Sequence, residues 1–317
     1  MRIAVLMSGG DAPAMNAVLR AITRYALGHR AEVIGIHDGF YGLLAGLTSP
    51  LTHVDVRGLE ERGGAWLGSA REPRMLSHIF QKRAARRLRD MDVSSLIVIG
   101  GNGSQRGSYA LERLGARVIG VASTIDNDLA EFDTTLGVDT AITAATRAID
   151  DLKTTATSHR RVFIVEVMGR HSGYLATRAA LASGADLALV PEAPIEAWDV
   201  LATVRRAFLA GERHAIIVAA EGFPTPSSEV LFRLRRNGID ARLSVLGHLQ
   251  RGAQPTAADR LLAARMAVEA VEAALAGDHG FVLGPSRGDI VRVSFAAATS
   301  PCVKVTADDV RIIRALA

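Results

Sequence analysis

The sequence has one cysteine and no apolar run long enough to cross a membrane. The single Cys302 excludes an internal disulfide bond and favours a reducing compartment, so we expect a cytoplasmic protein. The longest apolar runs, residues 95–99 and 215–220, have the length of strands. Met1 and Arg2 lead straight into a strand pattern rather than into a secretory segment. We therefore expect no membrane partner.

Lysine is nearly absent, and arginine carries almost all the positive charge. Lysine occurs only at Lys82, Lys153 and Lys304, and the formal net charge is +4. Arginine forms planar, bidentate pairs with phosphate, so this usage favours small anionic ligands. The basic segment 82–89 has few aromatic residues nearby. Because nucleic-acid sites combine basic clusters with stacking aromatics, we expect a solvated helix face there and no nucleic-acid partner.

Strand and helix patterns alternate along the chain of 317 residues. Short apolar runs predict strands at 3–7, 32–36, 95–99, 118–121, 162–167, 187–190, 215–219 and 243–246. Helical spacing predicts helices at 15–27, 81–91, 107–114, 139–155, 173–182, 197–210, 227–236, 257–275 and after 307. Such alternation implies right-handed βαβ units with both sheet faces covered. We predict an α/β protein with two Rossmann-like three-layer domains, largely parallel sheets and an active-site cleft between the domains.

Three polar turns follow predicted strands in the first half of the chain. They read SGGDAP at 8–13, GGNGS at 100–104 and TIDND at 124–128. The carboxyl ends of parallel strands line the ligand crevice of such folds, and glycines there let backbone N–H groups approach an anion. The acids and hydroxyl of the third turn suit proton removal from an alcohol beside a metal-bound phosphate. Each turn alone is equally well explained as a tight or capping turn, but three together indicate one site.

Known nucleotide signatures are missing, since neither GxGxxG nor GxxxxGK[ST] occurs. A dinucleotide fold and a P-loop kinase are therefore unsupported. Further along, cations and polar groups flank later strands, at Arg160–Arg161, 168–171 (MGRH), Glu221, Arg242 and 247–251 (GHLQR). Taken singly, these residues suit surface ion pairs and turns. Their repeated placement at strand ends favours a sugar-phosphate site, with arginines for phosphate and Glu221 and His248 for hydroxyls or orientation.

The order and spacing of these motifs resemble those of the bacterial ATP-dependent 6-phosphofructokinases over essentially the whole chain. The matching segments are SGGDAPAMN, RGGAWLGSAR, IGGNGS, TIDND, TATSHRR, EVMGRHSG, AEG and VLGHLQRGAQPTAADR. The resemblance implies phosphoryl transfer from MgATP to the 1-hydroxyl of fructose 6-phosphate in glycolysis. It implies a homotetramer with active sites shared between subunits. It also implies an ATP-binding domain of residues 1–138 and 251–304, and a smaller fructose-6-phosphate-binding domain of residues 139–250 and 305–317.

The resemblance also assigns roles to residues. Asp126 matches the general base, Thr124 and Asp128 match groups that position it and the transferring phosphoryl, and Arg170 matches the cation of the transition state. The ATP site is matched by Gly10, Arg71, Glu72, Gly101, Asn102, Gly103 and Ser104. The sugar-phosphate site is matched by Thr124, Asp126, Met168, Gly169, Arg170, Glu221, His248 and Arg251. Arg161 and Arg242 match arginines that reach in from a neighbouring subunit, so a lone monomer would lack a complete substrate site.

Several positions depart from the family pattern. Asn102 stands where the family has a magnesium-binding aspartate, and Mg²⁺ prefers carboxylate although an amide oxygen can ligate it. We expect reduced turnover or a higher magnesium requirement, with Asn102 as the metal residue. Gly103 and Ser123 lack the aspartate and lysine of pyrophosphate-using relatives, which favours ATP. Ser123 departs from the family's usual glycine, Ala14 and Ala253 depart from the pattern as well, and we expect Glu72, near the nucleotide, to weaken its binding.

The family's effector site binds ADP or phosphoenolpyruvate through a cluster of cations. Four residues fit that site, namely Arg20, Arg24, Lys153 and Asp186, whereas Ala210 and Glu212 replace basic residues. The lost positive charge predicts weak or absent control by these effectors. An alternative reading from another class is a low-activity or non-catalytic paralogue that binds nucleotide or sugar phosphate in a regulatory role. Asn102 and the altered effector site are its only support.

Overall fold

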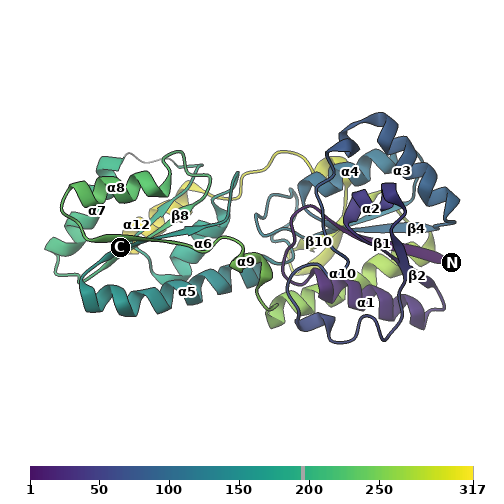
Figure 1. Ribbon diagram of the computed structural model, residues 1–317, viewed down its shortest axis with the longest axis horizontal. Helices are drawn as coiled ribbons and strands as arrows, with labels where there is room; N and C mark the ends of the chain where they lie inside the picture. The colour runs from purple at the N-terminus through teal and green to yellow at the C-terminus, as the bar shows by residue number, and fades with distance from the viewer. Residues whose placement is uncertain (194–196, 317) are drawn as a thin grey trace. The chain divides into compact units, whose positions relative to one another are not determined.

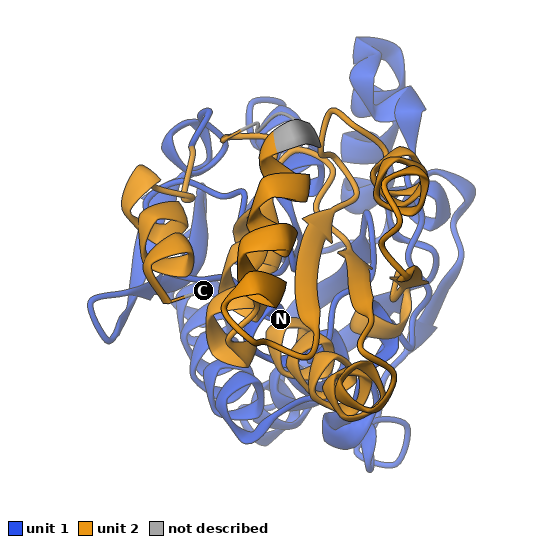
Figure 2. Ribbon diagram, turned by 90° about the vertical axis from the view of Figure 1, so that its left-hand side faces the viewer, with its two compact units in different colours: residues 1–140, 251–302 blue, residues 141–250, 303–317 orange. Residues whose placement is uncertain are grey.

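The computed structural model describes residues 1–193 and 197–316, which form two compact units (Figure 1, Figure 2). Unit 1 comprises residues 1–140 and 251–302, and unit 2 comprises residues 141–250 and 303–317. The assignment of ATP and fructose 6-phosphate to these two parts of the chain stays a prediction. The cleft expected between the domains stays a prediction.

Unit 1 is built on a seven-stranded, mostly parallel sheet in the order β11-β10-β5-β4-β1-β2-β3. Four parallel strands form its centre, namely β1 (Arg2–Ser8), β2 (Glu32–Ile36), β4 (Ser95–Gly100) and β5 (Val118–Ala122). Residues of β4 and β5 are buried at every position, as is usual for strands covered on both faces. The edges are β3 (Thr48–Pro50) and the antiparallel hairpin of β10 (Phe281–Ser286) and β11 (Asp289–Ser294).

Helices cover both faces of this sheet. Figure 1 shows α1 (Met15–Gly28) and α10 (Ala257–Ala276) on one face, and α3 (His78–Asp90) and α4 (Asn102–Glu112) on the other. Shorter elements complete the unit: α2 (Gly39–Ala45), α11 (Phe295–Ala298), and the 3-10 turns η1 (Leu59–Glu61) and η2 (Pro73–Leu76). The apolar stripe of α1, including Leu19 and Ile22, is fully buried. Burial of this stripe, rather than helix propensity, stabilises the helix in place.

The strand order places a topological switch point at the centre of the sheet. β2 pairs with one edge of β1, and β4 pairs with the other edge, where Ser8 lies opposite Gly100. In open α/β sheets, ligands bind outside the carboxyl ends of the strands at such a point. The two glycine turns that follow Ser8 and Gly100 are therefore neighbours in the position where this fold binds ligands.

Unit 2 has a four-stranded parallel sheet in the order β7-β8-β6-β9. Its strands are β6 (Val162–Val167), β7 (Leu187–Leu189), β8 (Ala215–Ala220) and β9 (Ala241–Val245). Its helices are α5 (Val138–His159, which starts in unit 1), α6 (Tyr174–Ser183), α7 (Ala197–Leu209), α8 (Ser227–Arg236), α9 (Leu249–Gly252, which ends in unit 1) and α12 (Ala307–Leu316). Figure 1 shows α7 and α8 on one face and α5 on the other. Ile164, Val204 and Val230 belong to the buried core beneath α7 and α8.

The predicted α/β class with two largely parallel sheets is confirmed, but several elements differ from expectation. The helix expected at 107–114 begins at Asn102, so the second glycine turn forms its first turn. Two glycines in this stretch lower helix propensity, and tertiary contacts override them. The strands β3, β10 and β11 and the helix α2 were not anticipated. Among the residues that the structure describes, no helix has the length and apolar character needed to span a membrane.

Candidate active site

The first glycine turn lies beneath the side chain of Arg251. Arg251 Nη1 donates a hydrogen bond to Asp11 O at 2.6 Å, and a Cβ atom at Gly10 would lie only 2.7 Å from that nitrogen. Gly9 has a φ of 90°, which favours glycine, and its N–H donates to Ala70 O at 3.3 Å. The side chain of Arg251 thus lies across the turn that carries Gly10. Its role at the sugar phosphate, which the family resemblance implies, stays a prediction.

The second glycine turn is the N-terminus of α4. Gly101 is the N-cap and its position has no side-chain cap, so the N–H groups of the first turn remain available to an anion. Asn102 and Ser104 lie in this first turn, together with the exposed Gly103. A Cβ atom at Gly103 would meet no atom of the described residues within 4 Å. The terminus is therefore open at the position of Gly103.

Gln105 supports the ends of β4 and β5, which lead into the second glycine turn and the acidic turn, and it was not anticipated from the sequence. This fully buried side chain donates from Nε2 to the carbonyl oxygens of Gly100 at 2.9 Å, Val121 at 3.2 Å and Val98 at 3.3 Å. It thereby ties the ends of β4 and β5 together. The sequence gave little signal for this role, because the helix was expected to begin only at residue 107 and Gln105 lies before that point.

The acidic turn packs against the start of α4. Asn102 Nδ2 donates to Asp128 O at 3.1 Å, and a Cβ atom at Gly101 would lie 3.0 Å from Thr124 Cβ. Thr124 Oγ1 accepts a hydrogen bond from Asp126 N at 3.2 Å. Asp126 and Asp128 are only partly buried. The structure therefore brings Asn102, Thr124, Asp126 and Asp128 together within unit 1.

Two further hydrogen bonds hold the shape of the acidic turn. Thr135 Oγ1 donates to Thr124 O at 2.6 Å. Asn127 has a φ of 50°, and its Nδ2 donates to Asp133 O at 3.3 Å. Asparagine tolerates this left-handed conformation better than most residues, which explains its place between the two acids.

Arg71 and Glu72 lie beside the first glycine turn but differ in environment. Arg71 is exposed, whereas the Glu72 side chain is 4% exposed and forms an ion pair with Arg74. The hydrogen bond from Arg74 holds the pKa of Glu72 below its usual range, so this carboxyl is ionised and paired. We expected Glu72 to weaken nucleotide binding, but the charge of its carboxylate is already matched by Arg74.

In unit 2, the loops after β6 and β8 converge at the carboxyl edge of the sheet. Met168 N donates to Gln250 Oε1 at 2.8 Å, and Gly222 N donates to Gly169 O at 3.2 Å. A Cβ atom at Gly222 would overlap Arg170 O, so glycine is required there by close approach. The structure thus joins the loop of Met168, Gly169 and Arg170 to the loop that begins at Glu221.

The remaining polar residues of this edge are accessible. Arg170, Glu221 and His248 are all exposed, and His248 follows Gly247 in the turn after β9. Leu246 N, just before that turn, donates to Glu166 O at 2.9 Å. The turn after β9 is therefore held next to the end of β6, where a switch point of the second sheet also lies.

Arg161 and Arg242 lie at the amino ends of β6 and β9, opposite the carboxyl ends where the loops described above lie. Arg161 Nε donates to Asp240 Oδ2 at 2.7 Å, and Arg242 Nη1 also pairs with Asp240. The hydrogen bond from Arg161 lowers the pKa of Asp240. From Val162 to the end of β6, five steps of about 3.3 Å make a span of roughly 16 Å. Within one subunit, these two arginines are therefore not brought together with Met168 and Gly169.

The residues expected at an effector site are divided between the units. In unit 1, Arg24 is exposed and Arg20 Nε lies 2.9 Å from Glu60 Oε2. In unit 2, Lys153 contacts Ser183 O and lies 3.8 Å from Asp150 Oδ1. Asp186 accepts a hydrogen bond from Ile216 N at 2.7 Å, and its burial raises its pKa. Three of these four residues thus already have protein partners.

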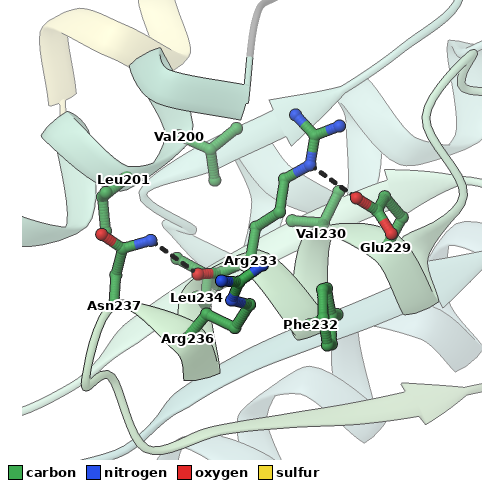
Figure 3. A pocket seen from close by; sticks show the side chains of 9 residues that line it. All are labelled: Val200, Leu201, Glu229, Val230, Phe232, Arg233, Leu234, Arg236 and Asn237. Atoms are coloured by element: carbon green, nitrogen blue, oxygen red, sulfur yellow. Dashed lines mark hydrogen bonds and ion pairs between the residues drawn. The ribbon is translucent and has the colours of Figure 1, made fainter.

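A cavity of about 440 Å³ in unit 2 lies away from all these residues (Figure 3). It is lined by Val200, Leu201, Glu229, Val230, Phe232, Arg233, Leu234, Arg236 and Asn237, from α7 and α8 and the turn that follows α8. Its floor consists of core residues on a face of the sheet, whereas the predicted site residues lie at strand ends. The cavity is therefore separate from the candidate active site.

The donor set available to a metal ion is small. Among residues 1–193 and 197–316, no group of three or more His, Cys, Asp or Glu side chains is placed to hold a metal. The amide nitrogen of Asn102 is engaged by Asp128 O, which leaves the amide oxygen to face a cation. Such a set fits Mg²⁺ bound mainly by substrate phosphates and water, with few protein ligands.

The fold and these turns are those of an α/β phosphotransferase, in which backbone N–H groups and arginines surround a phosphate beside an acid. A family model described as Phosphofructokinase matches residues 2–274. The chain belongs to the phosphofructokinase family.

Individual relatives agree with this membership. The chain is 43% identical over 289 residues to an ATP-dependent 6-phosphofructokinase of Lactobacillus helveticus, covering 91% of this chain and 90% of the relative. It is 42% identical over 290 residues to the protein of the same description from Tolumonas auensis, covering 92% and 91%. Both relatives match almost their full length.

Solved structures show the same fold. Pichia pastoris phosphofructokinase in the T-state has a TM-score of 0.90 and 32% identity, with 94% of this chain covered. This chain spans 35% of that yeast chain. A pyrophosphate-dependent phosphofructokinase from Marinobacter aquaeolei has a TM-score of 0.84 and 25% identity, covering 97% of this chain and 86% of its own.

Proposed function

We propose that the protein transfers a phosphoryl group from ATP to the 1-hydroxyl of fructose 6-phosphate, giving fructose 1,6-bisphosphate and ADP in glycolysis. The observation that carries this proposal is the contact between Asn102 and Asp128, which sets the loop of Asp126 against the open N-terminus of α4. The ATP-dependent relatives, 42–43% identical over almost their full length, support ATP as the donor. They do not favour a non-catalytic regulatory role.

In the proposed reaction, the Asp126 carboxylate accepts the proton of the sugar 1-hydroxyl. The freed oxygen attacks the γ-phosphorus, the bond to the bridging oxygen breaks, and ADP leaves with that electron pair. Thr124 Oγ1 fixes the backbone of Asp126 through its 3.2 Å hydrogen bond. The N–H groups of α4 and of the turn at Gly10 bind phosphate oxygens, and Arg170 balances the charge of the transition state.

Mg²⁺ is the cofactor that we propose for this site. The Asn102 amide oxygen and the Asp128 carboxylate would hold it, together with ATP phosphates. When bound, the ion neutralises phosphate charge. The sugar phosphate would meet Met168, Gly169, Glu221 and His248 at the carboxyl edge of the second sheet.

The position of Arg161 and Arg242 supports a site shared between subunits. These arginines lie roughly 16 Å along β6 from the sugar-phosphate residues of their own subunit, so they serve such a site only in another copy. This supports an oligomer with active sites shared between subunits, and the homotetramer that we propose rests on the family resemblance. We further propose a cytoplasmic location, which rests on the family's place in glycolysis and on the single cysteine of the sequence, Cys302.

A coupled assay that compares ATP with pyrophosphate across a magnesium titration tests the proposal. We expect turnover of fructose 6-phosphate with ATP in the presence of Mg²⁺ and none with pyrophosphate. Turnover with pyrophosphate alone would refute ATP as the donor. Tight ATP binding by calorimetry without any turnover would instead support the regulatory alternative.

A further inference from the structure

Glu72 directly follows Arg71, and both oxygens of its carboxylate accept hydrogen bonds from Arg74. Its Oε1 accepts hydrogen bonds from Arg74 N at 3.1 Å and from Arg74 Nε at 2.7 Å, and its Oε2 accepts from Arg74 Nη2 at 2.5 Å. The Glu72 side chain is 4% exposed, whereas that of Arg74 is 45% exposed. Arg74 thus covers the acid, and its charge is matched by a two-pronged guanidinium pair.

Arg74 in turn fastens this segment to two helices. Its guanidinium carbon lies 5.7 Å from the ring centre of Tyr41 in α2 and 5.4 Å from that of Phe80 in α3. Cations over aromatic faces at such distances are attracted by the ring quadrupole. In the same turn, Gln81 Nε2 donates to Met75 O at 2.8 Å, and Met75 is buried. The segment after Glu72 is therefore fixed to the helical layer of unit 1.

The other end of the segment is fixed to the first glycine turn. Ser69 Oγ donates to Gly9 O at 2.9 Å, and Gly9 N donates to Ala70 O at 3.3 Å. Arg71 lies between these two anchors. It is exposed, and within the described part of the chain its side chain has no hydrogen bond or ion pair. An unengaged cation is thus held on a braced segment next to Gly9 and Gly10.

We propose that Glu72 is a positioning residue for ATP, which acts through Arg74 to hold Arg71 beside the glycine turn. This inference rests on the proposed function of the site. An unpaired glutamate next to Arg71 would oppose nucleotide phosphates, whereas the ion pair neutralises that acid and orders the segment before the ligand arrives. Ordering a binding group in advance lowers the entropy lost on binding. The substitution at this family position therefore strengthens ATP binding instead of weakening it.

The test measures steady-state constants of the full-length protein for Glu72→Ala, Arg74→Met and the double variant. We expect KM for ATP to rise about tenfold in each single variant, with kcat and KM for fructose 6-phosphate within about twofold of the parent. Because both residues belong to one unit, the double variant should be no worse than either single variant. The control is Glu32→Ala, which breaks the 2.9 Å pair with Arg2 in the same unit and should change none of these constants.

The Arg71→Ala background separates positioning from a general structural role. There, removal of Glu72 should change KM for ATP no further, because the group that it positions is gone. An unchanged or lowered KM for ATP in Glu72→Ala would overturn the inference, as would an equal rise in the Arg71→Ala background. Should Glu72→Ala not fold, Glu72→Gln keeps an acceptor oxygen and should raise KM about threefold.

The failure of the proposed function is distinguishable from the failure of this inference. A parent protein without ATP-dependent turnover refutes the proposed function alone. Calorimetric titration with ATP then tests the inference, and the same tenfold weakening in Glu72→Ala is expected for the dissociation constant. An unchanged dissociation constant would overturn it.

Discussion

Replacing Asn102 by aspartate changes both the charge and the hydrogen bonding at the start of α4. In the parent, Asn102 Nδ2 donates to Asp128 O at 3.1 Å. A carboxylate has no donor for that carbonyl, so the variant loses about 1 kcal/mol from this hydrogen bond. A negative charge in the first turn of a helix returns about 0.3–1 kcal/mol. Without ligand, we therefore expect Asn102→Asp to be equal to the parent in stability or slightly less stable.

With MgATP bound, the same change is expected to be favourable. A carboxylate about 4 Å from a divalent ion gains up to roughly 8 kcal/mol at an effective dielectric near 20, and solvent and the ATP phosphates reduce that figure. If about 1.4 kcal/mol of it remains, the magnesium concentration for half-maximal activity falls about tenfold. We therefore expect Asn102→Asp to need less magnesium and to turn over faster than the parent.

The assay is a magnesium titration of turnover at fixed ATP, with thermal unfolding recorded in the absence of nucleotide. Asn102→Ala is the matched control, because it removes the amide without adding charge. It should lose stability and should not lower the magnesium requirement. The same half-saturating magnesium concentration for Asn102→Asp and the parent would refute the placement of Asn102 at the metal.

Three further predictions concern stability and control. Ala14 is fully buried with a φ of 68°, a conformation that costs a non-glycine residue about 1–2 kcal/mol. Ala14→Gly should therefore raise the Tm by a few degrees in calorimetry. An unchanged or lower Tm would argue against strain at this position. Burial raises the pKa of Asp259 above its ordinary 3.8, although Thr140 and Gly137 donate hydrogen bonds to it. The resulting stabilisation is full below pH 3.8 and is lost as the pH rises through the higher folded-state pKa, so the Tm of the parent should decline over that range. The Tm of Asp259→Asn should lack this decline, and a Tm–pH profile parallel to the parent's would contradict the prediction. Because Arg20 already pairs with Glu60, ADP and phosphoenolpyruvate should leave the fructose 6-phosphate saturation curve unchanged, and a sigmoidal curve with phosphoenolpyruvate would contradict that.

Much of the fold was readable from the sequence because parallel strands buried on both faces are continuous apolar runs. The strands at 32–36 and 162–167 and the helix at 227–236 match expectation residue for residue. The β10–β11 hairpin was missed, because β11 is half exposed and carries charged residues among its apolar ones. The start of α4 was missed because the glycines after Gly101 obscure a helix that buried contacts of Gln105 stabilise.

The candidate site was readable at the level of turns but not of side-chain partners. Spacing alone placed the glycine turns and the acidic turn at strand ends, and the structure joins the second glycine turn to the acidic turn through Asn102. The pairing of Glu72 with Arg74 could not be seen in the sequence, because an ion pair two residues apart depends on the backbone of η2. Similarly, the pairing of Arg161 with Asp240 joins residues far apart in the chain.

The most direct measurement of the central claim is the turnover of Asp126→Asn with ATP, fructose 6-phosphate and Mg²⁺. Removing a general base costs about 10²–10⁴-fold in rate, so kcat should fall by that factor while both KM values stay within a few-fold of the parent's. Turnover of Asp126→Asn at the rate of the parent would contradict the assignment of Asp126 as the proton acceptor.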